Sequence, residues 1–380
     1  MDKNTLKILN LIINENIKPA DISKFYKDSG SFDIKMKNKN GQKASEKDSV
    51  GEGGYLKRNM INHLIESFHR KEFQIINIAQ EIYPYLLKEI FFSPPLLFCK
   101  GKAEILKSKL CIAVVGTRKC SRYGMDAAGF LSRELSKLGF TIVSGMAMGI
   151  DRIAHGAVLN ENGKSIGVLG TGIDVTYPPE NRDLFRNMIK NGCLITEFFP
   201  SVKPLKQNFP ARNRIISGIS IGVIIIEAGE KSGAVITAKA AVRENREVFA
   251  VPGSIFSDNS LGCHKLIQNG AKLIHGIDDI LVELENYIKD YGIKTTKSET
   301  KKEEYVNRNK KTEIFGLSIS ADQKKIIAEV LNCIDYNEKS FEEIQKITNM
   351  DKNKLLQIIS FLQLNDYIIE KSFNNYVLNK

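Results

Sequence analysis

Residues 111–145 read CIAVVGTRKCSRYGMDAAGFLSRELSKLGFTIVSG, and this stretch decides the fold class. It begins with an apolar run that ends at Gly116, continues through a helical pattern near 124–138, and closes on a second apolar run that ends at Gly145. Apolar runs without polar alternation are typical of strands that are buried on both faces of a sheet. A strand, a helix and a second strand joined by short turns therefore indicate one unit of a parallel sheet.

The same unit repeats as far as residue 275. Four further apolar runs follow, at 165–170, 193–198, 222–228 and 247–253. Four further helical patterns lie near 150–162, 180–191, 211–219 and 233–245. This alternation predicts an α/β fold with a Rossmann-like, doubly wound parallel sheet, in a domain that spans 72–290.

The segments on either side of this domain differ from it in composition. Residues 1–71 contain one candidate amphipathic helix, LKILNLIINENI (6–17), and then a Lys-, Asn- and Gly-rich stretch from Asp33 to Arg58, so we expect a divergent or partly disordered N-terminal region. Residues 291–318 are polar and charged, as in a linker. Residues 319–380 show three helical patterns followed by two short strand-like pieces, the order of a winged helix-turn-helix domain.

The composition favours an anionic partner and a reducing compartment. The formal net charge is +11, but Lys, Asn and Ile are frequent throughout, so local basic clusters carry more weight than the total. The six cysteines form no CxxC pair, which favours free thiols and a cytoplasmic location. The longest apolar run, Ile215–Ile226, is too short to span a bilayer, and the N-terminus does not read as a signal peptide. His and Cys lack metal-ligand spacing, so no metal or other cofactor is expected.

Glycine-rich loops follow several of the predicted strands. In a parallel sheet these loops meet at one edge, where ligands bind beyond the carboxyl ends of the strands. Glycine lets a backbone approach a ligand closely, and amides at the following helix N-termini can bind phosphate oxygens. The loop residues that we expect at this edge are Gly145, Gly149, Gly170, Thr171 and Gly172.

Two basic clusters are expected at the same edge. Arg118, Lys119 and Arg122 follow the first strand. The segment KPLKQNFPARNR (203–214) lies between the fourth and fifth strands and contains four cations, one aromatic ring and no acid. Cations with an exposed ring suit a nucleic-acid strand, because the cations bind phosphates and the ring stacks on a base. We place Pro210 just before a helix, with Arg212 and Arg214 in its first turn, where cations are unfavourable without a nearby anion.

The sequence motifs give little support to an enzymatic function. The segment GMAMG (145–149) lacks the GxGxxG spacing of a dinucleotide site, and no GxxxxGK[ST] phosphate loop occurs. Ser144, Asp151 and His155 are close in sequence, but an acid and a histidine four residues apart more often cap and orient a helix than form a catalytic triad. Glu197 and Glu227 are expected to end adjacent strands, and a hydrogen-bonding or charge-balancing role beside the arginines is favoured over acid/base catalysis.

Taken in order, these motifs resemble the DNA-processing protein A family, also called Smf. The resemblance covers about residues 75–285. The matching segments are VVGTRKCSRYG (114–124), IVSGMAMGIDRIAH (142–155), GVLGTGIDVTYP (167–178), PLKQNFPARNRIISG (204–218), EAGEKSGAVITA (227–238), VFAVPG (248–253) and GCHKLIQNGAKLI (262–274).

The resemblance implies a DNA-binding protein without catalytic residues. Such a protein binds single-stranded DNA in natural transformation and recombination, loads the RecA recombinase onto it, displaces single-strand-binding protein, and forms a homodimer. By motif, Arg118 and Lys206 are the pocket cations and Phe209 is the base-stacking ring, while Arg212, Asn213 and Arg214 belong to the same signature. Some members carry a lysine where this chain has Pro179, and Arg182 would supply that charge instead.

Three points stay open at the level of sequence. A nucleotide phosphoribohydrolase of the LOG type has a related fold, but its PGGxGTxxE motif is absent from EAGEKSGAVITA. A winged-helix transcription regulator would bind duplex DNA, yet residues 320–380 carry eight Lys and Arg against nine Asp and Glu, which favours a protein-interaction or regulatory role. Leu266 and Ile267 are either a dimer interface or part of the packing against the sheet.

Overall fold

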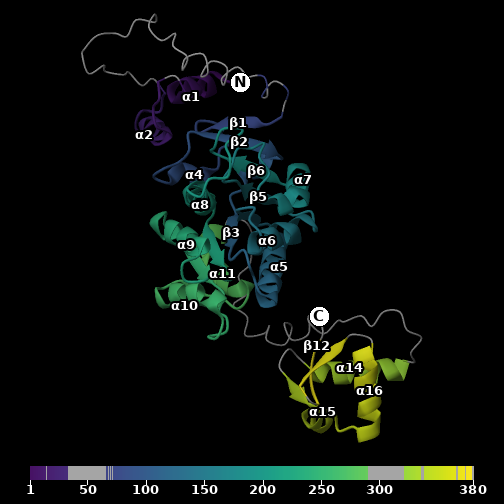
Figure 1. Cartoon of the computed structure of the whole chain (residues 1–380). Helices are drawn as coiled ribbons and strands as arrows, with labels where there is room; N and C mark the ends of the chain where they lie inside the picture. The colour runs from purple at the N-terminus through teal and green to yellow at the C-terminus, as the bar shows by residue number, and fades with distance from the viewer. Residues whose placement is uncertain are drawn as a thin grey trace, which may run out of the picture. The chain divides into compact units, whose positions relative to one another are not determined.

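The computed structural model describes residues 1–13, 15–32, 66, 68, 70, 72–289, 321–334, 338–364, 367–372 and 374–378. The chain divides into two compact units, Met1–Thr296 and Lys297–Lys380 (Figure 1). The loop expected over 33–58 and the linker expected over 291–318 lie outside the described residues. The domain boundaries expected from the sequence stay predictions.

A nine-stranded sheet, counted over the described residues, forms the centre of the first unit. Its parallel part runs in the order β6 (Cys193–Thr196), β5 (Ser165–Val168), β4 (Thr141–Ser144), β3 (Cys111–Val115), β7 (Gly222–Ile225), β8 (Glu247–Ala250) and β9 (Lys272–Leu273). β2 (Leu96–Gly101) pairs antiparallel with β6, and β1 (Gln74–Asn77) pairs antiparallel with β2. The predicted doubly wound, Rossmann-like sheet is confirmed.

Helices cover both faces of this sheet. On one face α5 (Arg122–Lys137), α6 (Ile150–Leu159) and α11 (Ile277–Glu283) pack over side chains such as Ile112 and Phe249. On the other face α8 (Asn208–Ile219), α9 (Gly233–Arg243) and α10 (Leu261–Gln268) pack over side chains such as Ala113. Three shorter or more peripheral helices accompany them, which are α4 (Tyr85–Glu89), α7 (Arg182–Asn191) and α12 (Glu285–Ile288), with short 3₁₀ segments at Ala103–Lys107, Pro179–Asn181 and Asp258–Ser260.

The order of the strands reverses between β3 and β7. From β3 the chain proceeds through β4 and β5 to β6, and then returns to place β7 on the other side of β3. A crevice forms at such a switch point, beyond the carboxyl ends of the strands. The loops after β3, β4, β5 and β7 and the N-terminus of α8 all lie along that edge.

Two N-terminal helices belong to the first unit. α1 (Lys3–Ile13) matches the amphipathic helix that the sequence predicts, whereas α2 (Pro19–Ser29) was not predicted. Ile8 and Ile22 are fully buried in the same apolar cluster as Ile75 of β1. The side-chain amide of Asn77 also donates to Thr5 Oγ1 at 2.9 Å. These helices therefore extend the core of the first unit beyond the antiparallel edge of the sheet.

The second unit has its own small core. It comprises α14 (Ala321–Cys333), α15 (Phe341–Thr348), α16 (Lys352–Leu364) and a three-stranded antiparallel sheet of β10 (Lys339–Ser340), β12 (Asn375–Leu378) and β11 (Ile368–Ser372). Val330, Ile344 and Leu362 are fully buried at its centre. Three helices and this sheet form the predicted winged helix. Across the described parts of both units, no helix is long and apolar enough to cross a membrane.

Candidate nucleic-acid interface

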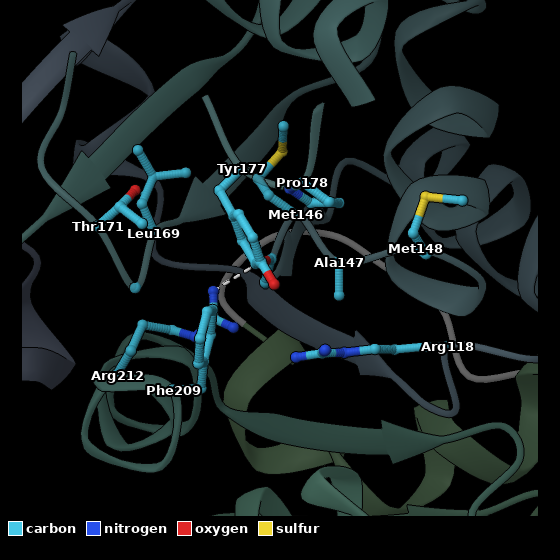
Figure 2. Close-up of a pocket in the computed structure, with 12 residues that line it drawn as sticks. Arg118, Met146, Ala147, Met148, Leu169, Thr171, Tyr177, Pro178, Phe209 and Arg212 are labelled. Atoms are coloured by element: carbon cyan, nitrogen blue, oxygen red, sulfur yellow. Dashed lines mark hydrogen bonds between the residues drawn. The ribbon is translucent and has the colours of Figure 1, made fainter. Parts of the chain in front are cut away.

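A pocket opens at the carboxyl edge of the sheet, between the loops after β3, β4 and β5 and the first turn of α8 (Figure 2). We call it the carboxyl-edge pocket. It brings together six of the residues predicted from sequence, which are Arg118, Gly145, Gly170, Thr171, Phe209 and Arg212. Its other lining residues are Met146, Ala147, Met148, Leu169, Tyr177 and Pro178.

The Phe209 ring lines this pocket and contacts three other side chains of the lining. The Arg118 guanidinium is 5.5 Å from the ring centroid and that of Arg212 is 5.9 Å away, both within the range of a cation–π contact. The Tyr177 ring lies 5.6 Å away at an interplanar angle of 41°. The pocket therefore presents an aromatic surface that is flanked by two positive charges (Figure 2).

Arg212 is part of the pocket wall. Its side chain is buried, and Nη1 donates to the carbonyl oxygen of Gly145 at 2.6 Å and also to that of Val168. Burial lowers the pKa of Arg212 to about 10, so the side chain still carries its charge at neutral pH. Arg212 thus joins the ends of β4 and β5 to α8 and keeps a cation beside the ring.

The start of α8 differs from the prediction. We expected Pro210 just before the helix and Arg212 and Arg214 in its first turn, but α8 begins at Asn208. Proline is tolerated in a first turn because the amides there have no intrahelical partner. The earlier start brings Phe209 into the first turn, where it faces the loops of the sheet edge, and moves both arginines further into the helix.

Arg118 lies in a loop that a buried carboxylate anchors. Glu227, two residues after the end of β7, accepts hydrogen bonds from the backbone amide of Ser121 at 2.9 Å and from its hydroxyl at 2.5 Å. The amide of Thr117 donates to the Glu227 carbonyl oxygen at 2.8 Å. Arg118 itself is exposed and has no hydrogen bond or ion pair with another described residue. The loop is held in place while its cation stays free for a ligand.

Two glycines make this packing possible. Gly149 has φ +73°, and a Cβ added there would lie 2.4 Å from the carbonyl oxygen of Thr117, so a side chain would displace the Arg118 loop. A Cβ at Gly170 would lie 2.9 Å from Cδ1 of Phe209. Because Gly170 has no Cβ, the sheet edge lies closer to the Phe209 ring than it could with a larger residue at that position.

Arg214 and Asn213 have partners within the protein. Arg214 forms an ion pair with Glu197, as the charge-balancing reading predicts. Burial raises the pKa of Glu197, and the neighbouring Arg214 partly opposes this shift. The side-chain amide of Asn213 donates to the carbonyl oxygen of Gly233 at 3.2 Å. These contacts fix α8 against the sheet and against α9.

The remaining predicted residues lie outside the pocket lining. Four cations are exposed along the loops and helix starts of the same edge, and they are Lys119, Arg122, Arg182 and Lys206. Arg122 pairs with Asp126 at 3.4 Å. Gly172 is buried in the turn after β5. Leu266 and Ile267, the candidate dimer residues, are half-buried and pack against the main core.

A sequence profile of the DNA recombination-mediator protein A family matches residues 74–285, which is more than half of the chain. The chain belongs to this family. The DNA processing protein DprA of Bacillus subtilis is 42% identical over 224 residues, covering 59% of this chain and 75% of the relative. The protein of the same name from Streptococcus pneumoniae is 45% identical over 223 residues, covering 59% and 78%.

Solved structures from the same family support the fold. The crystal structure of DNA processing protein A from Streptococcus pneumoniae aligns with a TM-score of 0.57 and 37% identity, covering 74% of this chain and 93% of that one. The Helicobacter pylori protein, whose structure was described for its single-stranded DNA binding mode, aligns with a TM-score of 0.51 and 30% identity. The alignment covers 97% of that protein and 56% of this chain.

The triad considered from sequence does not assemble in this chain. The Ser144 hydroxyl donates to the carbonyl oxygen of Val114 at 2.6 Å. His155 Nδ1 instead lies 2.7 Å from Ser165 Oγ, and burial lowers the pKa of His155 to about 3. Asp151 accepts the amides of the loop after β4. These three side chains therefore stabilise the fold. Over the described residues, no cluster of His, Cys, Asp or Glu is arranged to hold a metal ion.

Sequence reasoning missed six residues that line the carboxyl-edge pocket, which are Met146, Ala147, Met148, Leu169, Tyr177 and Pro178. Tyr177 matters most because its ring lies against Phe209. The available signal was its position, since Tyr177 follows β5 in the glycine-rich loop that was already expected at the carboxyl edge. An aromatic residue in such a loop can therefore be predicted to belong to the site.

Proposed function

We propose that this protein binds single-stranded DNA in the carboxyl-edge pocket and acts as a recombination mediator. The observation that carries the proposal is the Phe209 ring, with Arg118 and Arg212 guanidinium groups 5.5 and 5.9 Å from its centroid. An accessible ring stacks on a base of any sequence, and an exposed cation beside it, here Arg118, binds a backbone phosphate. The Helicobacter pylori relative, described for its single-stranded DNA binding mode, supports the same ligand.

The residues at the edge divide into two groups. Phe209 stacks on a base and Arg118, which has no acidic partner among the described residues, binds a phosphate. Exposed cations extend the phosphate path on either side, and they are Lys119, Arg122, Arg182 and Lys206. Arg212 and Arg214 hold the pocket in shape, since both make hydrogen bonds within the protein.

As a mediator, the protein loads the RecA recombinase onto the bound strand and competes with single-strand-binding protein, in transformation or recombination. This activity needs binding and handover and no bond cleavage. A homodimer through α10 would place two pockets on one assembly. Leu266→Arg should then reduce the mass measured by light scattering to that of a monomer, with circular dichroism as the check on folding. An unchanged mass would argue against this interface.

The direct test is competition between single-stranded and duplex oligonucleotides for the full-length protein, followed by fluorescence anisotropy. We expect unlabelled single strands to displace the labelled strand at lower concentration than duplex of the same sequence. Equal competition would contradict the proposal. Preference for one duplex sequence would favour a transcription regulator, and release of free base from AMP would favour a phosphoribohydrolase.

A further inference from the structure

A second hollow, of about 340 Å³, lies at the switch point of the sheet. We call it the switch-point crevice. Its walls are the loop after β3, with Gly116 and Thr117, and the start of α9, with Ser232 and Gly233. It shares Arg118, Phe209 and Arg212 with the carboxyl-edge pocket, so the two hollows adjoin at the same ring and cations.

The N-terminus of α9 opens into this crevice. α9 is an 11-residue helix, and the amides of Gly233, Ala234 and Val235 form its first turn. These three amides donate no hydrogen bond to any other residue in the described part of the chain. Aligned peptide dipoles give such an end a partial positive charge, which favours an anion.

Ser232 gives a second and independent indication. It is the N-cap residue of α9, a position where the serine side chain usually accepts an amide of the first turn. Here the side chain makes no such bond. Its Oγ is buried and has no hydrogen-bond partner within the described residues. A buried hydroxyl without a partner is costly, and a ligand oxygen in the crevice would satisfy it.

The charges around the crevice also favour an anion. Arg118 and Arg212 contribute two cations, and one carboxylate, that of Asp151, lines the crevice. That carboxylate accepts the amides of Gly145 at 3.0 Å and Ala147 at 3.3 Å, so two donors already stabilise its charge. Arg118 and the open amides of α9 are hydrogen-bond donors without acceptors among the residues that line the crevice.

We propose that the switch-point crevice binds one phosphate group of the DNA strand whose base stacks on Phe209. The open amides of α9, the hydroxyl of Ser232 and the guanidinium of Arg118 together supply donors for the phosphate oxygens. This inference rests on the proposed function, because it assigns a second contact to the same strand. It also separates a base subsite at the pocket from a phosphate subsite at the crevice.

The test is a Ser232→Asp variant of the full-length protein. Aspartate is well tolerated at an N-cap position, so α9 should stay folded while the crevice gains a negative charge. Ser340→Asp is the matched control, because Ser340 is the N-cap residue of α15 in the second unit. Both variants are titrated with the shortest oligonucleotide that binds fully, and with a series in which one phosphate at a time is replaced by a neutral methylphosphonate.

In the wild-type protein and in Ser340→Asp, we expect at least one linkage at which neutralisation weakens binding. In Ser232→Asp, neutralising that linkage should no longer weaken binding. The slope of log K against log salt should also fall by about 0.7, the contribution of one phosphate contact on a single strand. Phe209→Leu should leave the linkage pattern in place, because it removes a base contact only.

Three results would overturn the inference. Ser232→Asp could bind with the wild-type slope and linkage pattern, which would leave the pocket as the binding site and the crevice outside it. Deoxyadenosine monophosphate could bind the wild-type protein and not Ser232→Asp while oligonucleotide binding stays equal, which would assign the crevice to a free nucleotide. If the wild-type protein binds no single strand, the proposed function itself fails, and that result is distinct from the first two.

Discussion

Replacing Phe209 by leucine separates the two kinds of contact that the pocket offers. Leucine keeps an apolar side chain beside Gly170 and removes the aromatic face. The ring lies within 6 Å of two guanidinium groups and 5.6 Å from Tyr177, so its loss changes the stacking surface without removing a cation. Binding should weaken, while the number of phosphates contacted should stay the same.

The expected size follows from the chemistry of stacking. One base stacked on an aromatic side chain contributes about 1 to 3 kcal/mol, so Kd should rise by roughly 5-fold to 150-fold. The salt slope should not change, because it counts phosphates. The assay is fluorescence anisotropy at several salt concentrations, with an intact oligonucleotide and with an otherwise identical one that has abasic sites in place of its bases.

The abasic oligonucleotide supplies the control. Phe209→Leu and the wild-type protein should bind it with similar affinity, because it has no base to stack. An equal loss on intact and abasic strands would mean that the ring only supports the shape of the pocket. Unchanged affinity for the intact strand would remove Phe209 from the interface altogether.

Three further predictions concern stability. Arg212→Met removes the donor to the carbonyl oxygens of Gly145 and Val168 and should lower the free energy of unfolding in urea by about 1 to 3 kcal/mol, whereas an unchanged value would show that these bonds add nothing. Gly149→Ala forces a Cβ against Thr117 at φ +73° and should lower the melting temperature; an equally stable variant would refute the close approach. Burial lowers the pKa of His155 from 6.5 to about 3, so as the pH falls below about 6.5 the unfolded chain binds a proton that the folded chain does not. The free energy of unfolding therefore declines below that pH. His155→Gln should therefore lose about 1 kcal/mol less than the wild-type protein between pH 7 and 5.5 in urea titrations, and equal losses would contradict this.

Much of the sheet could be predicted because its central strands are buried on both faces. The apolar runs that end at Gly116, Gly145 and Gly170 are β3, β4 and β5, and their loops meet where parallel topology requires. The outer strands were harder to recognise. β1 and β2 form an antiparallel edge, and β9 has only two residues, Lys272 and Leu273, both exposed.

The site was predictable in its main residues and not in its geometry. Arg118 and Phe209 were both expected, but their contact depends on α8 beginning at Asn208, two residues before the proline that we expected to precede the helix. Whether an arginine is free or paired also depends on tertiary contacts. The sequence places Arg118 and Arg212 in equally basic segments, and only packing exposes the first and buries the second.

The N-terminal helices show another limit of sequence reasoning. α2 is rich in polar residues, and the apolar positions that it buries gain their partners from α1 and from the antiparallel edge of the sheet. A segment that depends on distant partners for its core carries a weak local signal. Its helical character was therefore missed, whereas the more regular apolar pattern of α1 was recognised.

The central claim is that the carboxyl-edge pocket binds a single strand through Arg118. The most direct measurement compares the affinity of Arg118→Ala and wild-type protein for a single-stranded oligonucleotide across a range of salt concentrations. Arg133→Ala is the control, since Arg133 is a partly exposed arginine of α5, outside the residues that line the pocket, and its Nε lies 4.0 Å from a Glu161 carboxylate oxygen. We predict weaker binding and a salt slope reduced by about 0.7 for Arg118→Ala, with wild-type behaviour for Arg133→Ala. Equal affinity and slope for all three proteins would contradict the claim.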